Sequence, residues 1–140
     1  FEVTEPWIGS VGDPVALIAD SISGLVHLCH ERGPFLRAFT DAAATDERFE
    51  EAWNQFLGQF DDAASARIDA DQAQGLIPDC DVRPVAIALK RLNAFTIIEA
   101  FGQRPRRQPE PVQEALARIW ISSLYGSEWL GNDSSSLIRT

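Results

Sequence analysis

The chain has 140 residues, of which 45% are hydrophobic and 24% charged, so it is long enough for one folded domain with its own core. Its net charge of −9 makes it a poor partner for the phosphate backbone of a nucleic acid. No apolar run is long enough to span a membrane and no signal peptide is recognisable. We therefore expect a cytoplasmic protein with reduced thiols at Cys29 and Cys80.

Residues 1–12 predict an irregular lead-in or the remnant of a preceding helix, because a proline and two glycines surround Trp7. The chain contains no methionine, not even at position 1, and we therefore expect a fragment or a processed product. Asp13 then predicts the start of a helix, since it is a favoured N-cap and a proline follows it at the first helical position.

The first long helix is predicted to end at Gly33-Pro34. Its apolar residues recur at helical spacing: Val15, Ile18, Ile22, Leu25, Val26 and Cys29. His27 and His30 lie one turn apart and can meet on one face, but a tetrahedral metal site needs further ligands. The favoured interpretation is a pair of surface histidines beside a buried thiol, so we predict no metal site and no cofactor.

A short helix over 35–44 and a much longer one over 46–74 are expected next, the second capped by Asp46. Asp81 can cap a further helix that ends near Gly102. A last helix opens at one of the prolines 109 and 111 and ends at Gly126.

No segment alternates apolar and polar residues as a strand does. The chain therefore predicts an all-α fold of about five helices in one domain over 13–126, with a flexible tail over 127–140.

The last two helices are apolar on more than one face, which predicts burial on both sides. We expect a homodimer in which these helices form an intermolecular four-helix bundle. The alternative is that they lie at the centre of the monomer. Trp120 is expected to turn inward, while either the Ile119/Ser123 side or the Ile121/Tyr125 side meets the second copy.

An aromatic line on the long helix runs through Trp53 and Phe60. Such a line is most often part of a core. Two features favour a pocket: Trp120 supplies a second indole, and Asn93 is an amide in an apolar helix that needs a partner. Apolar walls with a few polar groups are typical of small-molecule sites. The only lysine, Lys90, lies one turn before Asn93 and is expected to reach solvent beside this pocket.

Three segments carry a family resemblance: "AAATDERFEEAWNQFLGQF", "VRPVAIALKRLNAFTIIEAFG" and "ALARIWISSLYG". They resemble the last long helices of TetR-family repressors, and in particular those of a mycobacterial member of that family. The resemblance covers about residues 35–126. It implies a transcriptional regulator with an N-terminal helix-turn-helix and a helical ligand-binding domain that dimerises through its last two helices.

The resemblance also implies a tunnel for an apolar small-molecule effector, with Trp53, Asn93 and Trp120 as pocket residues. Lys90 stands where the relative has a second pocket amide. The full set of ligand-binding residues that we expect is Ile18, Ile22, Leu25, Trp53, Leu57, Phe60, Asn93, Ile97 and Trp120. Operator DNA would be contacted only through the missing N-terminal domain.

Motifs of enzymes are absent from the sequence: it has no phosphate-binding glycine loop and no pairing of a nucleophile with a base. We therefore expect no enzymatic activity. The alternative function is that of a helical protein-interaction or structural domain without a small-molecule ligand.

Overall fold

The computed structural model describes residues 6–9 and 12–126, without the side chains of residues 6, 56, 57, 59 and 60. These residues form helices and no strands, which confirms the all-α prediction. The helices are α1 (Pro6–Gly9), α2 (Pro14–Glu31), α3 (Gly33–Thr45), α4 (Glu47–Ala73), α5 (Val82–Phe101) and α6 (Pro109–Leu124). The five expected helices are α2 to α6. The tail predicted over 127–140 lies outside the described residues.

The helix ends follow from local hydrogen bonding. Asp13 accepts a hydrogen bond from the backbone N–H of Val15 at 3.1 Å, and Asp46 accepts one from that of Arg48 at 2.9 Å, so these two predicted caps are confirmed. Asp81 stands at the N-cap of α5 as predicted, but its side chain makes no capping hydrogen bond. Gly126 ends α6 with φ of 96°, a left-handed conformation that a side chain disfavours. Its N–H bonds back to the carbonyl of Ile121 at 3.2 Å.

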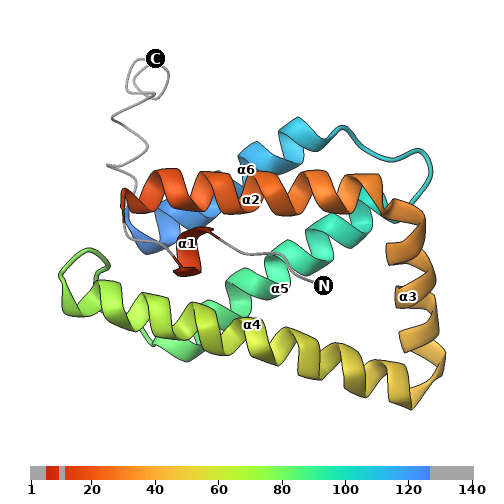
Figure 1. Ribbon diagram of the computed structural model, residues 1–140, viewed down its shortest axis with the longest axis horizontal. Helices are drawn as coiled ribbons and strands as arrows, with labels where there is room; N and C mark the ends of the chain where they lie inside the picture. Colours follow the sequence, from red (N-terminus) through yellow and green to blue (C-terminus); the bar gives the residue numbers. More distant parts are fainter. Residues whose placement is uncertain (1–5, 10–11, 127–140) are drawn as a thin grey trace.

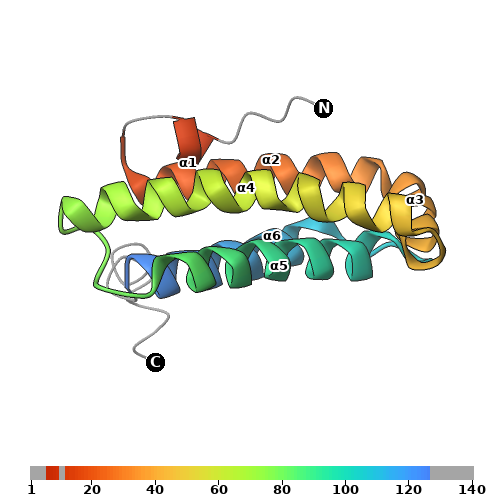
Figure 2. The ribbon, with the colours of Figure 1, turned by 90° about the horizontal axis from the view of Figure 1, so that it is seen from below.

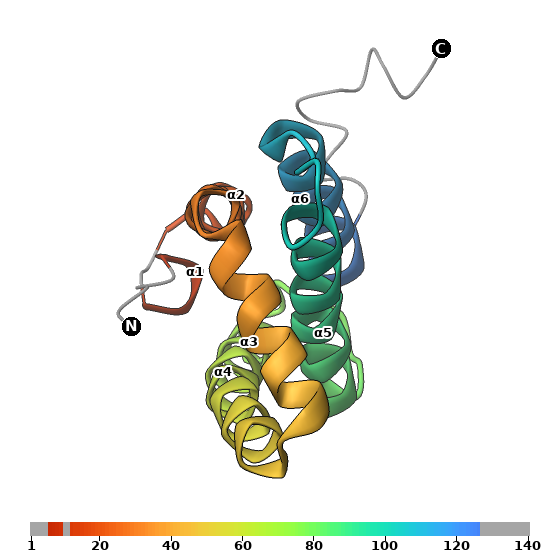
Figure 3. The ribbon, with the colours of Figure 1, turned by 90° about the vertical axis from the view of Figure 1, so that its right-hand side faces the viewer.

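The helices form two layers (Figures 1 and 2). Helices α2 and α4 make one layer and are joined at one end by α3, while α5 and α6 make the other. Figure 3 shows this connection end-on, with α3 running from α2 to α4. The short α1 lies between α2 and α4, on the side away from α5 and α6. It falls in the segment for which an irregular lead-in was predicted.

The core lies between the two layers. Its buried hydrophobic residues come mainly from α2, α5 and α6. On α2 and α6 the buried aliphatic residues recur at intervals of three to five positions and so share one face of each helix. These residues are Ile18, Ile22 and Val26 on α2, and Val112, Leu116, Ile121 and Leu124 on α6. Burial of each such side chain stabilises the fold by about 1.5–3 kcal/mol.

A charged pair joins α4 to α5. Arg91 donates two hydrogen bonds to the two oxygens of Asp61, at 3.0 and 2.9 Å. The Asp61 side chain is 3% exposed and that of Arg91 30% exposed, so the carboxylate depends on the guanidinium for its compensation. A second pair, Arg83 with Asp62, links the same helices but is largely exposed.

The contrast between these two pairs predicts their effects on stability. Arg91→Ala should lower the free energy of unfolding by about 2–3 kcal/mol, because it leaves the buried Asp61 carboxylate uncompensated. Arg83→Ala is the matched control and should change it by less than about 1 kcal/mol. Urea denaturation followed by circular dichroism measures both values. Equal effects from the two substitutions would contradict the assignment of Asp61 as a buried, dependent charge.

Candidate functional site

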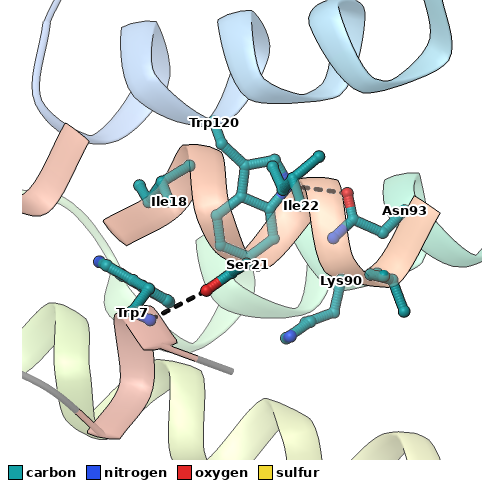
Figure 4. A pocket seen from close by; sticks show the side chains of 8 residues that line it. Trp7, Ile18, Ser21, Ile22, Lys90, Asn93 and Trp120 are labelled. Carbon is teal, nitrogen blue, oxygen red and sulfur yellow. Dashed lines mark hydrogen bonds between the residues drawn. The ribbon is translucent and has the colours of Figure 1, made fainter. Parts of the chain in front are cut away.

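A small cavity lies where α1, α2, α5 and α6 meet (Figure 4). About 10 Å³ of it is open to a water molecule, which is room for about one water. Its lining residues are Trp7, Ile18, Ser21, Ile22, Leu25, Lys90, Asn93 and Trp120. The walls are therefore apolar and aromatic, with an amide, an amine and a hydroxyl as the polar groups.

Trp120 and Asn93 form the polar centre of this cavity. The indole N–H of Trp120 donates to Oδ1 of Asn93 at 2.8 Å, joining α6 to α5. Trp120 is 3% exposed and Asn93 5% exposed, so each supplies the partner that the other needs away from water. Trp120 thus turns inward, and the amide of the apolar helix α5 has the partner that its position required.

Trp7 of α1 closes the opposite wall. Its ring meets that of Trp120 edge to face, with the ring centroids 5.5 Å apart and the planes at 83°. Its indole N–H donates to Oη of Tyr125 at 2.8 Å, and its backbone N–H donates to Oγ of Ser21 at 2.9 Å. With 1% of its surface exposed, Trp7 is a fully buried member of the core.

A chain of hydrogen bonds continues from Trp7 into α4. Tyr125 donates its hydroxyl proton to Oδ2 of Asp71 at 2.7 Å. Arg67 donates to the same Asp71 oxygen at 3.1 Å and to the carbonyl oxygen of Trp7. Its guanidinium also lies 5.7 Å from the centroid of the Trp7 ring. Burial raises the pKa of Tyr125 well above its ordinary value, and the hydrogen bond to Asp71 raises it further.

Lys90 lies within the cavity wall. It is 7% exposed, and its Nζ is 5.5 Å from the centroid of the Trp120 ring. The expectation that this lysine reaches solvent beside the pocket is therefore wrong. The face of the Trp120 ring offsets part of the cost of burying the charge, as cation–π contacts do.

The structure brings five of the expected ligand-binding residues to the cavity: Ile18, Ile22, Leu25, Asn93 and Trp120. Ile97 is buried in the core one turn beyond Asn93 but does not line the cavity. The side chains of Leu57 and Phe60 lie outside the described residues.

Trp53 is not at this cavity. It lies near the start of α4, and its ring packs on Phe39 of α3 with the ring centroids 5.4 Å apart. Helix α4 has 27 residues, so its two ends face different neighbours. The helical spacing that aligned Trp53 with later residues of α4 carries no information about this difference.

Sequence reasoning missed Trp7 and Ser21 as lining residues. Ser21 follows Ile18 by three positions and precedes Leu25 by four, so it belongs to the same helix face and the signal was available. Trp7 gave no such signal, because it stands in a segment rich in proline and glycine, without periodicity.

Other candidate chemistry is limited in the part of the chain that the structure describes. No group of three or more His, Cys, Asp and Glu side chains is arranged to hold a metal ion there. His30 packs edge to face on Phe101. Burial raises the pKa of the half-buried Cys29 thiol to about 11, which keeps it protonated and unreactive near neutral pH. None of the described helices has the length and apolar character needed to cross a membrane.

Comparison with known proteins gives a consistent family match. Residues 18–126 match the family described as transcriptional regulator EthR, C-terminal domain. The chain is 31% identical over 93 residues to the HTH-type transcriptional regulator EthR of Mycolicibacterium smegmatis, which is 65% of this chain and 43% of that protein. It is 32% identical over 92 residues to the regulator of the same name from Mycobacterium tuberculosis, again 43% of that protein. The chain thus spans less than half the length of these relatives.

Tyr125 is the only tyrosine, so absorbance at 295 nm reports its ionisation alone. We expect the folded protein to resist ionisation of Tyr125 well above pH 10, and the urea-unfolded chain to titrate near the ordinary pKa of about 10. The resulting stabilisation is complete below pH 10 and is lost as the pH rises toward the raised folded pKa. Titration of the folded protein near pH 10 would contradict burial of this hydroxyl against Asp71.

Proposed function

The chain belongs to the family of C-terminal domains of EthR transcriptional regulators, and on that basis we propose that it binds an effector and dimerises in a TetR-like regulator. The family is one of transcriptional regulators and not of enzymes. The proposed effector is an apolar small molecule that controls DNA binding by a helix-turn-helix domain outside this chain, in the cytoplasm.

The observation that carries the proposal is the cavity between the two helix layers. Its wall joins α2, α5 and α6, so a molecule bound there contacts both layers at once. Aliphatic side chains from α2 and the Trp120 ring suit an apolar ligand, while Asn93 supplies a buried amide to orient it.

The size of the cavity determines the mechanism. Sites for drug-sized ligands are usually about 300–1,000 Å³, far more than the room for one water found here. An effector must therefore move side chains or helices apart in order to bind. Such a ligand binds the arrangement with the helices apart more tightly than the closed arrangement. This difference in affinity between the two arrangements can alter the spacing of two DNA-binding domains.

Ligand binding predicts thermal stabilisation by apolar compounds. A compound at about a hundred times its Kd should stabilise the protein by about 2.7 kcal/mol, which raises Tm by several degrees. Leu25→Trp fills the cavity and should abolish this shift. Leu28→Trp on the same helix is the control, since Leu28 does not line the cavity. A differential scanning fluorimetry screen measures the effect. Absence of any stabilising compound, or equal shifts in wild type and Leu25→Trp, would contradict the proposal.

Dimerisation is supported by the outer face of the second layer, which no other described helix covers (Figure 2). Phe95 on α5 is 66% exposed and Ile119 on α6 is 43% exposed. Ser123 is exposed as well, whereas Ile121 and Tyr125 are buried within the protomer. Of the two sides considered for the second copy, the Ile119/Ser123 side is thus the available one.

Glutamate at this face should disrupt the proposed dimer. Ile119→Glu and Phe95→Glu each place a charge where apolar surface would be buried, and we expect monomers by sedimentation velocity. Phe35→Glu is the matched control, because Phe35 is as exposed as Phe95 but belongs to α3, the helix that joins α2 to α4. A monomeric wild type, or a dimer unaffected by both substitutions, would refute this arrangement.

A further inference from the structure

Trp7 enters the cavity from outside the helix layers. Helix α1 lies between α2 and α4 on the side away from α6, yet the Trp7 ring touches Trp120 of α6. The indole therefore reaches through the first layer toward the second. Trp7 is also the one lining residue that precedes residues 18–126, the span matched to the family.

We propose that Trp7 is a built-in plug, whose indole occupies the subsite for an aromatic ring of the effector. The effector then carries a flat ring with an N–H or O–H donor, and its binding displaces α1. This inference rests on the proposed function as a ligand-binding domain. It adds the chemical class of the ligand and the segment that must move.

The contacts of Trp7 are those that a bound aromatic ligand would make. Its ring lies edge to face on Trp120, and its donor is satisfied by Oη of Tyr125. The Arg67 guanidinium lies over the ring. A ligand ring of the same shape regains all three of these contacts. Ser21 and Arg67 lose only the backbone N–H and carbonyl of Trp7 that they bind in the plugged state.

The plug is attached to the rest of the protein through two side chains of one short helix. Helix α1 is a single turn of four residues, and Ile8 is its other residue packed on the core. Its backbone is held by Ser21 at the N–H of Trp7 and by Arg67 at the carbonyl. Short segments with few such contacts open more readily than a whole domain.

A plug of this kind lowers the apparent affinity for the effector. The binding-competent state is only the unplugged fraction of the protein, and the apparent Kd rises by the inverse of that fraction. Any change that weakens the docking of α1 without touching the ring subsite must therefore tighten ligand binding. An increase in ligand affinity distinguishes a plug from an ordinary core residue or a ligand contact, because loss of either of those weakens ligand binding.

The probe is indole itself, the group that Trp7 would vacate. We expect Trp7→Ala to bind indole at least tenfold more tightly than wild type by isothermal titration calorimetry. In the Trp7→Ala protein, 1-methylindole should bind about two- to tenfold more weakly than indole, because it cannot donate to Tyr125. In wild-type protein labelled with 5-fluorotryptophan, saturating indole should shift the Trp7 ¹⁹F resonance, assigned with Trp7→Phe, to that of an exposed ring.

A second variant keeps the indole side chain and changes the cavity wall only by removing the Ser21 hydroxyl. Ser21→Ala removes the acceptor for the backbone N–H of Trp7, and should tighten indole binding by about two- to tenfold. Ser23→Ala on the same helix is the control and should leave the affinity unchanged. This test does not depend on the stability of the Trp7→Ala protein.

The outcomes separate the plug from the proposed function. Equal affinities for indole in wild type, Trp7→Ala and Ser21→Ala, with the Trp7 resonance unmoved, overturn the plug while leaving a ligand-binding domain intact. Failure of every variant to bind indole also overturns it. If apolar compounds then still stabilise the protein in the thermal screen, the function survives; if none does, both proposals fail.

Discussion

The buried indole N–H of Trp120 needs a hydrogen-bond acceptor inside the protein, and the arrangement of the neighbouring helices depends on supplying it. Helix α6 buries this ring between the two layers, where an unpaired donor costs about 1–3 kcal/mol. Asn93 on α5 supplies the acceptor and so determines how α5 and α6 are rotated against each other. Because Asn93 and Trp120 also line the cavity, the same bond that positions the helices defines the polar end of the candidate site.

A second buried polar chain ties the other wall to α4. Arg67, Asp71 and Tyr125 satisfy one another and hold Trp7 at its ring nitrogen and its carbonyl. Arg67 and Asp71 lie one turn apart on α4, Tyr125 follows α6 and Trp7 belongs to α1, so the network forms only when α1, α4 and the end of α6 are in place together. Networks of this kind favour one arrangement when they are complete, and an opening of the cavity disrupts them together.

The helices were predictable because their signals are local: Asp46 caps α4 through a residue two positions away. Five of the eight residues that line the candidate site were predictable. Among them, Asn93 stood out because a buried amide in an apolar helix needs a hydrogen-bond partner. Trp7 was not predictable, because its partner Tyr125 is 118 residues away and no periodicity marks α1. Trp53 was placed in the pocket because helical periodicity aligned it with later residues of α4. Periodicity does not tell which neighbouring helix each end of a long helix contacts, and Trp53 contacts Phe39.

The reactivity of the Lys90 amine reports how often the cavity opens. Lys90 is the only lysine of the chain, and it is buried against Trp120. A side-chain amine reacts with an electrophile only when reagent can reach it, so covalent modification of this chain's lysine proceeds no faster than the wall of the cavity exposes it. An agent that holds the two helix layers together therefore slows modification of the Lys90 amine. An agent that separates the layers exposes the amine to solvent and speeds its modification.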